Sequence, residues 1–371
     1  MDSNKQQILI VTSEFPPQPG GIGNHAYNLA NQLKAHHFGV TVIADARSSS
    51  GDEERIFDEA LSFNVSRVWV SKLRIIMYVK RLMLLNKALK RHQVVFASGK
   101  FSLWSVALFS LFYRRKYFAV VHGTEVNFKS LILKAAINGA LWRLKTIIAV
   151  SGYTKSLLKG PFHKKTMIIP NGYDATKWNK TNSSELKIKG SPKLITVGNV
   201  TERKGQIHVI RHLPRLIKKY PEVHYHCVGI PTEMESCIQE ANILGVQKHI
   251  TFHGKVSQED LLKLVGSSDI FVMLSGETKT GDVEGFGIAI IEANALGVPA
   301  IGAMGSGIED AILSKKSGLL IKGNDTKAFL NAVETILNNK QTFSKQASIW
   351  ADKHRWEHIV KQYIDLIRSI D

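Results

Sequence analysis

The sequence predicts an α/β protein built from two doubly wound domains, each with a parallel sheet. Short runs that are apolar throughout alternate with stretches of helical spacing, as is typical of strands covered by helices on both faces. This alternation stops at a polar segment and then starts again, which indicates a second domain. With 371 residues and 44% hydrophobic content, the chain can bury two such cores.

The first domain is expected over residues 1–182. It begins with an apolar strand at 8–12, a loop rich in Pro and Gly, and a helix at about 22–33. Further strands are predicted at 40–44, 94–97, 118–121 and 146–150. The polar segment 180–185 and the Gly-Ser-Pro at 190–192 indicate a linker.

The second domain is expected over residues 183–349 and repeats the pattern. Strands are predicted at 193–198, 223–229, 250–253, 270–274 and 298–302. Helices are predicted at about 206–219, 258–265 and 287–296. Ligands of doubly wound sheets bind beyond the carboxyl ends of the strands, so we expect the site in a central cleft that both domains face.

Three glycines follow the first strand, in the segment PPQPGGIGNH at 16–25. Gly20, Gly21 and Gly23 let the backbone approach a ligand, and a helix that starts at Ile22 offers N–H groups to an anion. The spacing is not the Gly-x-Gly-x-x-Gly pattern of dinucleotide binding. A tight turn without a ligand is the alternative interpretation.

The matching turn of the second domain is GNVTERKGQ at 198–206. Lys204 stands beside Gly205 just before a predicted helix, where it can neutralise a phosphate. A solvated lysine is the alternative, but the position at the carboxyl edge of the strands favours a binding role.

Two carboxylates stand eight positions apart in EGFGIAIIEA at 284–293. If Gly285 to Gly287 form the turn into a helix, Glu284 precedes it and Glu292 lies roughly 12 Å further along its axis. That spacing suits the sugar and the ribose of a nucleotide sugar, because carboxylates accept hydrogen bonds from vicinal hydroxyls. An acid favoured by the helix dipole is the alternative for Glu284. A purely structural role is harder to accept for Glu292, because burying an unpartnered acid is costly.

Five motifs together carry a family resemblance. They are PPQPGGIGNHAYNLA at 16–30, IIPNGYD at 168–174, ERKGQ at 202–206, SSDIFVMLS at 267–275 and EGFGIAIIEANALGVPAI at 284–301. Their order and spacing, from residue 8 to about residue 335, resemble the retaining glycosyltransferases of family 4, which have the two-domain GT-B fold. The loop sequence GDVEGFG is most similar to bacterial enzymes that glycosylate lipids or surface polysaccharide precursors, including phosphatidylinositol mannosyltransferases.

The resemblance implies roles for the matching residues. Glu292 would bind the ribose, and Glu284 would bind the donor sugar and stabilise an oxocarbenium-like state without acting as a general base. His122, in VVHGTE, matches the family histidine near the donor sugar, so His122 and Glu284 are the candidate catalytic residues. The candidate residues for the diphosphate and the donor backbone contacts are Gly21, Ile22, Gly23, Lys204, Gly285, Phe286, Gly287 and Ile288.

One position departs from the family pattern. Where the family usually has an arginine five residues before the phosphate lysine, this chain has Asn199. The leaving diphosphate needs positive charge as the bond breaks. Arg203 can supply that charge only if it points the same way as Lys204, so Asn199 and Arg203 are both counted among the candidate donor-site residues.

The resemblance also implies a mechanism. Transfer would retain the α configuration of the donor, with the departing phosphate oxygen taking the proton of the acceptor. No Asp-x-Asp metal motif occurs in the sequence, so we expect a metal-independent hexosyltransferase that uses a UDP- or GDP-sugar and no cofactor. Residues 350–371 would form a helix that crosses back to the first domain.

The positive charge lies almost entirely in the first half of the chain. Residues 1–180 hold 26 Lys and Arg against 10 Asp and Glu, whereas residues 181–371 hold 23 against 21. Between residues 60 and 173, Glu125 is the only acid. Such a half can serve nucleic acid, anionic lipid or phosphorylated substrates, or it can simply be a solvated surface.

The segment 71–92 combines seven Lys and Arg with Leu, Ile, Met and Val. This basic amphipathic pattern can lie on anionic lipid, or the segment can be an ordinary helix that packs its apolar face on the sheet. With YRRK at 113–116, it predicts peripheral binding at the inner membrane surface and a lipid-linked or glycan acceptor. Only two cysteines and no signal-peptide pattern occur, so we expect a cytoplasmic protein.

Three other functions stay open at this point. A basic nucleic-acid-binding protein would explain the charge, but no interleaving of aromatic and basic residues is evident, so we expect no nucleic-acid partner. A nicotinamide oxidoreductase would share the paired domains, but the glycine spacing is wrong. A nucleotide-sugar epimerase of GT-B architecture is the closer rival, and it would release a free epimer without an acceptor.

Overall fold

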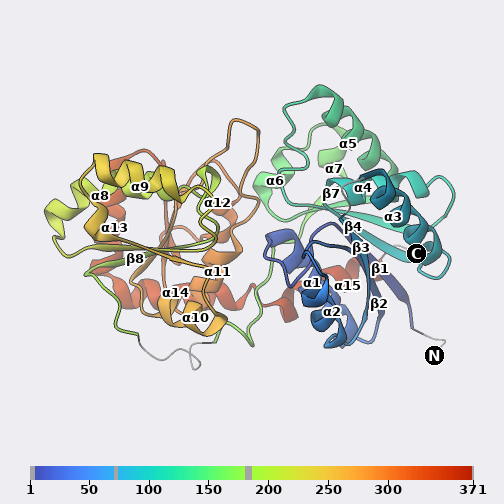
Figure 1. Ribbon diagram of the computed structural model, residues 1–371, viewed down its shortest axis with the longest axis horizontal. Coiled ribbons are helices and arrows are strands. Elements are labelled where there is room, and N and C mark those ends of the chain that lie inside the picture. The colour runs from blue at the N-terminus through green and yellow to red at the C-terminus, as the bar shows by residue number, and fades with distance from the viewer. Residues whose placement is uncertain (1–4, 71–73, 180–185, 370–371) are drawn as a thin grey trace. The chain divides into compact units, whose positions relative to one another are not determined.

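The computed structural model describes residues 5–70, 74–179 and 186–369 (Figure 1). The expected linker at 180–185 and the start of the basic segment, at 71–73, lie outside the described residues. The chain divides into an N-terminal unit, Met1–Asn171 with Trp356–Asp371, and a C-terminal unit, Gly172–Arg355. The boundaries expected from the sequence lie at residues 182 and 349.

The N-terminal unit contains a parallel sheet in the order β3-β2-β1-β4-β5-β6-β7. Its described strands are β1 (Gln7–Thr12), β2 (Gly39–Ala46), β3 (Asn64–Trp69), β4 (Val94–Ser98), β5 (Lys116–Val121), β6 (Thr146–Ala149) and β7 (Thr166–Ile168). Its described helices are α1 (Gly21–Ala35), α2 (Asp52–Glu59), α3 (Arg74–Leu89), α4 (Lys100–Phe109), α5 (Leu131–Arg143), α6 (Gly152–Ser156), α7 (Pro161–Lys164) and α15 (Trp356–Arg368). The strand order reverses between β1 and β4, so the carboxyl ends of these strands form the switch point where ligands of such sheets bind.

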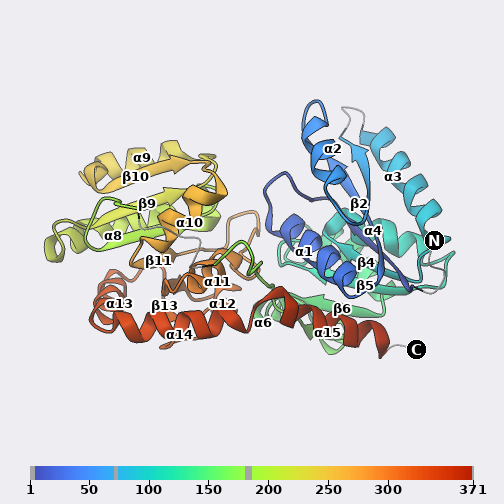
Figure 2. The ribbon, with the colours of Figure 1, turned by 90° about the horizontal axis from the view of Figure 1, so that it is seen from below.

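Helices cover both faces of this sheet because successive side chains of each buried strand point to opposite faces. On one face, Leu9 and Val11 of β1 join a core cluster with Met77 of α3, Leu103 of α4 and Ile137 of α5. Figure 1 shows α3, α4 and α5 as neighbouring helices. On the other face, α1 and α15 pack together (Figure 2), and the ring of Tyr363 meets Phe96 of β4 edge-on at 5.8 Å.

The C-terminal unit repeats the architecture with a parallel sheet in the order β10-β9-β8-β11-β12-β13. Its described strands are β8 (Lys193–Val197), β9 (His224–Val228), β10 (Ile250–Gly254), β11 (Ile270–Met273), β12 (Ala300–Ala303) and β13 (Gly318–Ile321). Its described helices are η2 (Glu202–Lys204), α8 (Gln206–Lys219), α9 (Met234–Ile243), η3 (Gln247–His249), α10 (Gln258–Gly266), α11 (Ile288–Ala295), α12 (Ile308–Ala311), α13 (Thr326–Asn338) and α14 (Lys340–Asp352). Its switch point lies between β8 and β11, which are adjacent.

Two parallel α/β sheets therefore confirm the predicted fold class. The helix expected over 350–371 begins later, because α14 ends at Asp352 and α15 starts at Trp356. The sequence predicted that Trp350 belongs to the crossing helix. Trp350 instead lies in α14, where its indole N–H donates to the Ala311 carbonyl at 2.9 Å. Within the described residues, no helix is both long and apolar enough to cross a membrane.

Candidate active site

The candidate site of the C-terminal unit is built by the two loops that follow the adjacent strands β8 and β11. The short helix η2 lies in the first loop and presents Arg203 and Lys204, whereas Glu284 lies in the second loop before α11. The Lys204 Nζ atom lies 2.8 Å from the Oε2 atom of Glu284, and the guanidinium of Arg203 donates to the same oxygen. Arg203 also pairs through Nε with Asp282 at 3.1 Å.

Glycines allow these loops to meet. Gly205, with φ of +76°, would place a Cβ 2.0 Å from the Leu274 carbonyl oxygen, so only a glycine lets the turn after η2 approach the end of β11. Gly307 would place one 2.0 Å from the Gly285 carbonyl oxygen, and its N–H donates to the Glu284 carbonyl at 2.9 Å. The backbone around Glu284 is thus held by the loop that follows β12, while its side chain is held by Arg203 and Lys204.

The paired charges set the ionisation of Glu284. Burial alone would raise its pKa, but the charges of Lys204 and Arg203 and their hydrogen bonds outweigh burial and lower this pKa to about 2. For Arg203 burial acts to lower the pKa, yet Glu284 and Asp282 raise it overall. Glu284 is therefore an anion at neutral pH, able to accept hydrogen bonds but not to donate a proton.

Glu292 lies in α11 in a different electrostatic environment. Burial raises the pKa of its carboxyl to about 7, although a hydrogen bond from Trp178 and the charges of Lys204 and Lys177 act against this rise. Because Lys204 influences both carboxylates, the three side chains belong to one charged cluster. A half-buried carboxyl with a pKa this near neutrality is typical of functional sites.

The remaining candidate donor-site residues of this unit are close in sequence to the charged cluster. Gly287 takes a left-handed conformation, with φ of +92°, and leads into α11 at Ile288. Phe286 is 2% exposed and its ring lies 5.8 Å from that of His354, so its side chain is core and only its backbone is available to a ligand. The side chain of Asn199 is exposed, and its carbonyl accepts a hydrogen bond from Gln206 at 3.1 Å.

His122 follows β5 in the N-terminal unit. Its Nε2 atom is hydrogen-bonded to the Ser98 hydroxyl at 2.9 Å, and its backbone N–H donates to Glu125 at 2.7 Å. The ring of His25 from α1 meets the His122 ring edge-on at 5.2 Å, and His25 is itself hydrogen-bonded to Tyr363 of α15 at 2.9 Å. Burial lowers the pKa of His122 to about 4, so the ring is neutral at pH 7.

The glycine loop of the N-terminal unit enters α1. A Cβ at Gly23 would lie 2.9 Å from the Phe15 backbone nitrogen, so this glycine is required for packing, whereas Gly21 is exposed with open space around it. Arg67 of β3 fixes the preceding loop by donating to the Pro16 carbonyl at 2.6 Å. Packing alone therefore explains the glycine at position 23. The backbone groups of Gly21 and Ile22 lie near the surface.

The structure thus brings together Arg203, Lys204, Glu284 and Glu292 in one unit, and places His122 with the glycine loop in the other. Sequence reasoning missed Asp282 and Trp178. Asp282 stands two positions before Glu284, the spacing at which an extended loop returns to the same side. Trp178 follows the NGYD motif by four residues and carried no signal of its own.

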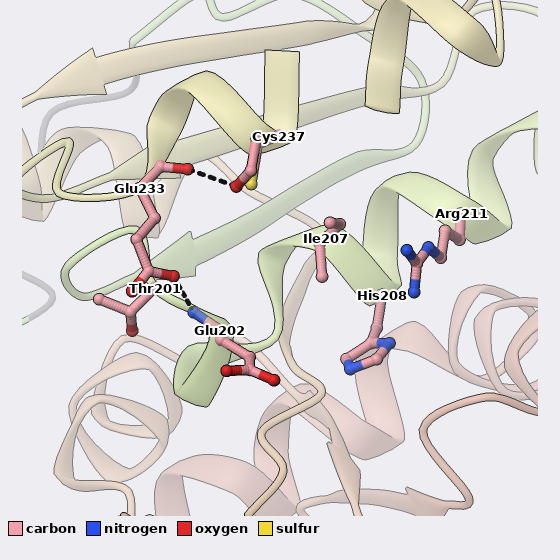
Figure 3. A pocket seen from close by; sticks show the side chains of 8 residues that line it. Thr201, Glu202, Ile207, His208, Arg211, Glu233 and Cys237 are labelled. Atoms are coloured by element: carbon pink, nitrogen blue, oxygen red, sulfur yellow. Dashed lines mark hydrogen bonds between the residues drawn. The ribbon is translucent and has the colours of Figure 1, made fainter. Parts of the chain in front are cut away.

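A small pocket lies next to the cluster along the chain, between the first turns of α8 and α9 (Figure 3). Its lining is Thr201, Glu202, Ile207, His208, Arg211, Glu233, Ser236 and Cys237. Figure 3 shows the Glu202 backbone N–H directed at the Glu233 carboxylate, to which it donates at 2.6 Å. This contact links η2 to Glu233 at the start of α9. In the described part of the chain, no group of three or more His, Cys, Asp and Glu side chains is arranged to hold a metal ion.

Two family models match almost the whole chain. Residues 19–177 match the model described as Glycosyltransferase Family 4, and residues 179–355 match the model described as Glycosyl transferases group 1. A GDP-mannose-dependent α-(1-6)-phosphatidylinositol monomannoside mannosyltransferase of Mycolicibacterium smegmatis is 27% identical over 351 residues, covering 89% of each chain.

Solved structures share the fold across the full length. Anabaena HepE, in complex with UDP and glucose, matches with a TM-score of 0.78 at 18% identity, covering 98% of this chain and 100% of that chain. A glycosyltransferase from Rickettsia africae matches with a TM-score of 0.80 at 19% identity, covering 99% of each.

Proposed function

The chain belongs to the family 4 glycosyltransferases of the GT-B fold, and from this premise we propose that it moves a hexosyl unit from a nucleoside-diphosphate sugar to an acceptor with retention of configuration. The observation that carries the proposal is the convergence of Arg203 and Lys204 on Glu284. Two cations and a sugar-binding carboxylate at a switch point suit a diphosphate joined to a sugar.

Binding of the donor would replace the ion pairs within this cluster. A diphosphate that binds beside Lys204 and Arg203 competes with Glu284 for them and releases the carboxylate to accept hydrogen bonds from sugar hydroxyls. The N-terminus of α11, with backbone groups of Gly285, Phe286, Gly287 and Ile288, adds favourable dipoles for the phosphates. Glu292, further along α11 beside Trp178, binds the ribose hydroxyls.

Charge development then determines the roles in catalysis. As the glycosidic bond breaks, negative charge grows on the leaving phosphate, and Lys204 and Arg203 stabilise it. The ionised Glu284 positions the sugar and stabilises the oxocarbenium-like state, and the departing phosphate oxygen takes the proton of the acceptor. His122, neutral because of its burial, offers hydrogen bonds to the donor sugar, and the Gly21-Ile22-Gly23 segment serves the phosphates with backbone N–H groups.

We propose a lipid-linked or surface polysaccharide precursor at the inner face of the membrane as the acceptor. The loop sequence GDVEGFG and the strongly basic N-terminal half support this class. GDP-mannose is the first donor to test, because the mycobacterial relative that covers 89% of the chain is named as GDP-mannose-dependent. UDP-glucose is the second donor to examine, because HepE was solved with UDP and glucose.

The oxidoreductase alternative loses support at Asp45, the acid near the carboxyl end of β2. In a dinucleotide-binding fold such an acid binds the ribose. Here Asp45 is buried and forms an ion pair with the buried Arg81, so its carboxylate serves the core and not a ribose.

A donor screen tests the proposal. Thermal stabilisation by GDP-mannose, UDP-glucose, GDP and UDP identifies the nucleotide, because a ligand that binds the native state raises Tm. Release of the nucleoside diphosphate with retention at the sugar carbon is the expected reaction, and Glu284→Gln should abolish it. Release of free epimerised nucleotide without an acceptor would instead identify an epimerase.

A further inference from the structure

Exposed apolar side chains are concentrated on one helical layer of the N-terminal unit. Of the 20 large hydrophobic side chains that are exposed among the described residues, 11 lie on α3, on α5, or in the last turn of α4 and the residues just after it. They are Ile75, Ile76, Val79, Met83, Leu108, Leu111, Phe112, Leu131, Ile132, Leu133 and Trp142. The described residues of the C-terminal unit contribute five. Such a concentration of exposed apolar side chains is typical of an interaction surface.

The start of α5 is the most exposed part of this layer. Residues 131–136 are all exposed, and the helix first buries a side chain at Ile137. Leu131 is 82% and Ile132 is 81% exposed. A helix that only covers a sheet buries apolar positions in every turn, whereas the three apolar residues 131–133 at the start of α5 are all exposed.

The charges around this helix start favour an anionic partner. Lys129 and Lys134 flank the three apolar residues 131–133, and both are exposed. Glu125, the only acid between residues 60 and 173, is 4% exposed and accepts a hydrogen bond from the His122 backbone, so it does not offset this surface charge. Apolar side chains flanked by lysines suit the boundary between lipid headgroups and acyl chains.

The structure also decides how α3, the basic segment of the sequence, contributes. Arg81 is buried against Asp45 and is not available to lipid, which corrects its place among the basic surface residues. Met77, Leu85 and Leu89 pack on the sheet. The opposite side of the helix nevertheless exposes Ile76, Val79 and Met83, with Lys80 and Lys87 beside them. The packing interpretation is therefore confirmed for one face of α3, and lipid contact stays a prediction for the exposed face.

We propose that the start of α5, residues 129–136, inserts into the headgroup boundary of an anionic bilayer, with the outer face of α3 as a second contact of the same helical layer. The loop that leads from His122 to α5 is eight residues long, from 123 to 130. Bilayer contact at Leu131 and Ile132 therefore brings the carboxyl edge of this sheet to the lipid surface. This last step rests on the proposed function, because it places a membrane-embedded acceptor near His122.

Vesicle binding tests the proposal without donor or acceptor. The full-length protein is co-sedimented with vesicles of phosphatidylcholine and phosphatidylglycerol in equal parts, and with phosphatidylcholine alone. The double variant Leu131→Ser/Ile132→Ser should lower the partition coefficient for the mixed vesicles by at least about tenfold. Ile243→Ser is the matched control, because Ile243 of α9 is also 81% exposed, and it should bind as the unmodified protein does.

Two further variants separate insertion and charge from simple loss of folding. After subtraction of the signal of the unmodified protein with its six native tryptophans, the added fluorescence of Ile132→Trp should shift to shorter wavelength with mixed vesicles, whereas that of Ile243→Trp should not. Lys134→Glu should weaken binding to the mixed vesicles, while Lys345→Glu, at an exposed position of α14, should have a much smaller effect. Donor hydrolysis in solution should be the same in all of these variants as in the unmodified protein. The vesicle measurements use neither donor nor acceptor, so they test membrane binding even if the protein proves not to be a glycosyltransferase.

The contrary outcomes are equally definite. Equal partition of the double variant and the unmodified protein would overturn the proposal, as would equal binding of the unmodified protein to both vesicle types. If the double variant loses self-association in sedimentation velocity but keeps its lipid binding, the apolar start of α5 contacts a second copy of the chain and the proposal is wrong.

Discussion

Lys204 and Glu284 form an ion pair of 2.8 Å across the switch point of the C-terminal sheet, and the same carboxylate oxygen also accepts from Arg203. Two consecutive residues of a turn thus point the same way. The 3-10 geometry of η2, with Gly205 in the left-handed region behind it, makes this possible. We therefore propose that Arg203 supplies the positive charge that Asn199 does not.

The cation pair leads to a first prediction. Lys204→Ala should lower kcat by at least about tenfold, worth roughly 1.4 kcal/mol or more in the transition state, and Arg203→Ala should also lower kcat. Asn199→Arg should restore part of the activity of Arg203→Ala. Steady-state kinetics with saturating donor measure these effects, with Arg211→Ala as a control at a surface ion pair with Glu240. A loss below tenfold for Lys204→Ala would argue against a main role for this lysine.

The two carboxylates should change stability in opposite directions with pH. The pKa of Glu284 is lowered to about 2, so its stabilisation is present above its ordinary pKa of 4.5 and is lost as pH falls towards 2. Glu284→Gln should therefore cost on the order of 3 kcal/mol at pH 7. The pKa of Glu292 is raised to about 7, so its ionisation destabilises the fold as pH rises from 4.5 through 7. Glu292→Gln should consequently gain on the order of 2–3 kcal/mol at pH 8 and little at pH 4.5.

Thermal unfolding at a series of pH values measures both differences. Glu235→Gln, at an exposed position of α9, controls for the loss of one negative charge. If Glu292→Gln shows the same change in Tm at pH 5 and pH 8, the pKa of Glu292 is not raised in the folded protein.

A third prediction concerns the glycine that lets the two loops meet. Gly205→Ala should cost several kcal/mol and most of the activity, because a Cβ there would lie 2.0 Å from the Leu274 carbonyl oxygen. Gly245→Ala is the matched control, since Gly245 has a similar φ of +66° but open space around it, and it should cost only about 1–2 kcal/mol for the left-handed conformation. Denaturant unfolding measures the difference, and equal losses would show that the close approach is unimportant.

Metal removal gives a fourth prediction. The cations that we assign to the leaving diphosphate are side chains, so EDTA should leave the transferase rate unchanged in buffer without added metal. Activity that falls with EDTA and returns with Mg²⁺ or Mn²⁺ would contradict metal independence.

The sequence predicted the fold well where apolar periodicity is strong. The helix expected at 206–219 is α8 within its observed bounds, and the strand at 8–12 is β1. The strand β3 was not predicted, because Asn64–Trp69 mixes Ser and Arg with apolar residues and only Val68 is buried. The break between α14 and α15 was also missed, because helical spacing continues through residues 353–355 and the change of unit depends on tertiary packing.

The candidate site was predictable in its carboxylates but not in its contacts. Glu292 stood out because an acid interrupts an apolar helix pattern, and Glu284 because it stands at the turn just before that helix. The direction of Arg203, the partner Asp282 and the indole of Trp178 depend on loop conformation, which no periodicity encodes. Likewise, segment 71–92 allowed a lipid-facing or a sheet-facing helix, and only the packing revealed that one face of α3 is buried on the sheet while the opposite face is exposed.

The membership of α15 in the N-terminal unit has a consequence during biosynthesis. The Gly172–Arg355 unit is continuous and can close its core as soon as it leaves the ribosome. The N-terminal sheet must wait for Trp356 and Tyr363, which are buried against α1 and its neighbours. At about 5–20 residues per second, the intervening segment takes roughly 10–40 seconds to translate. Over that time one apolar face of the nascent sheet is exposed to water. We therefore expect the N-terminal unit to bind a chaperone during synthesis.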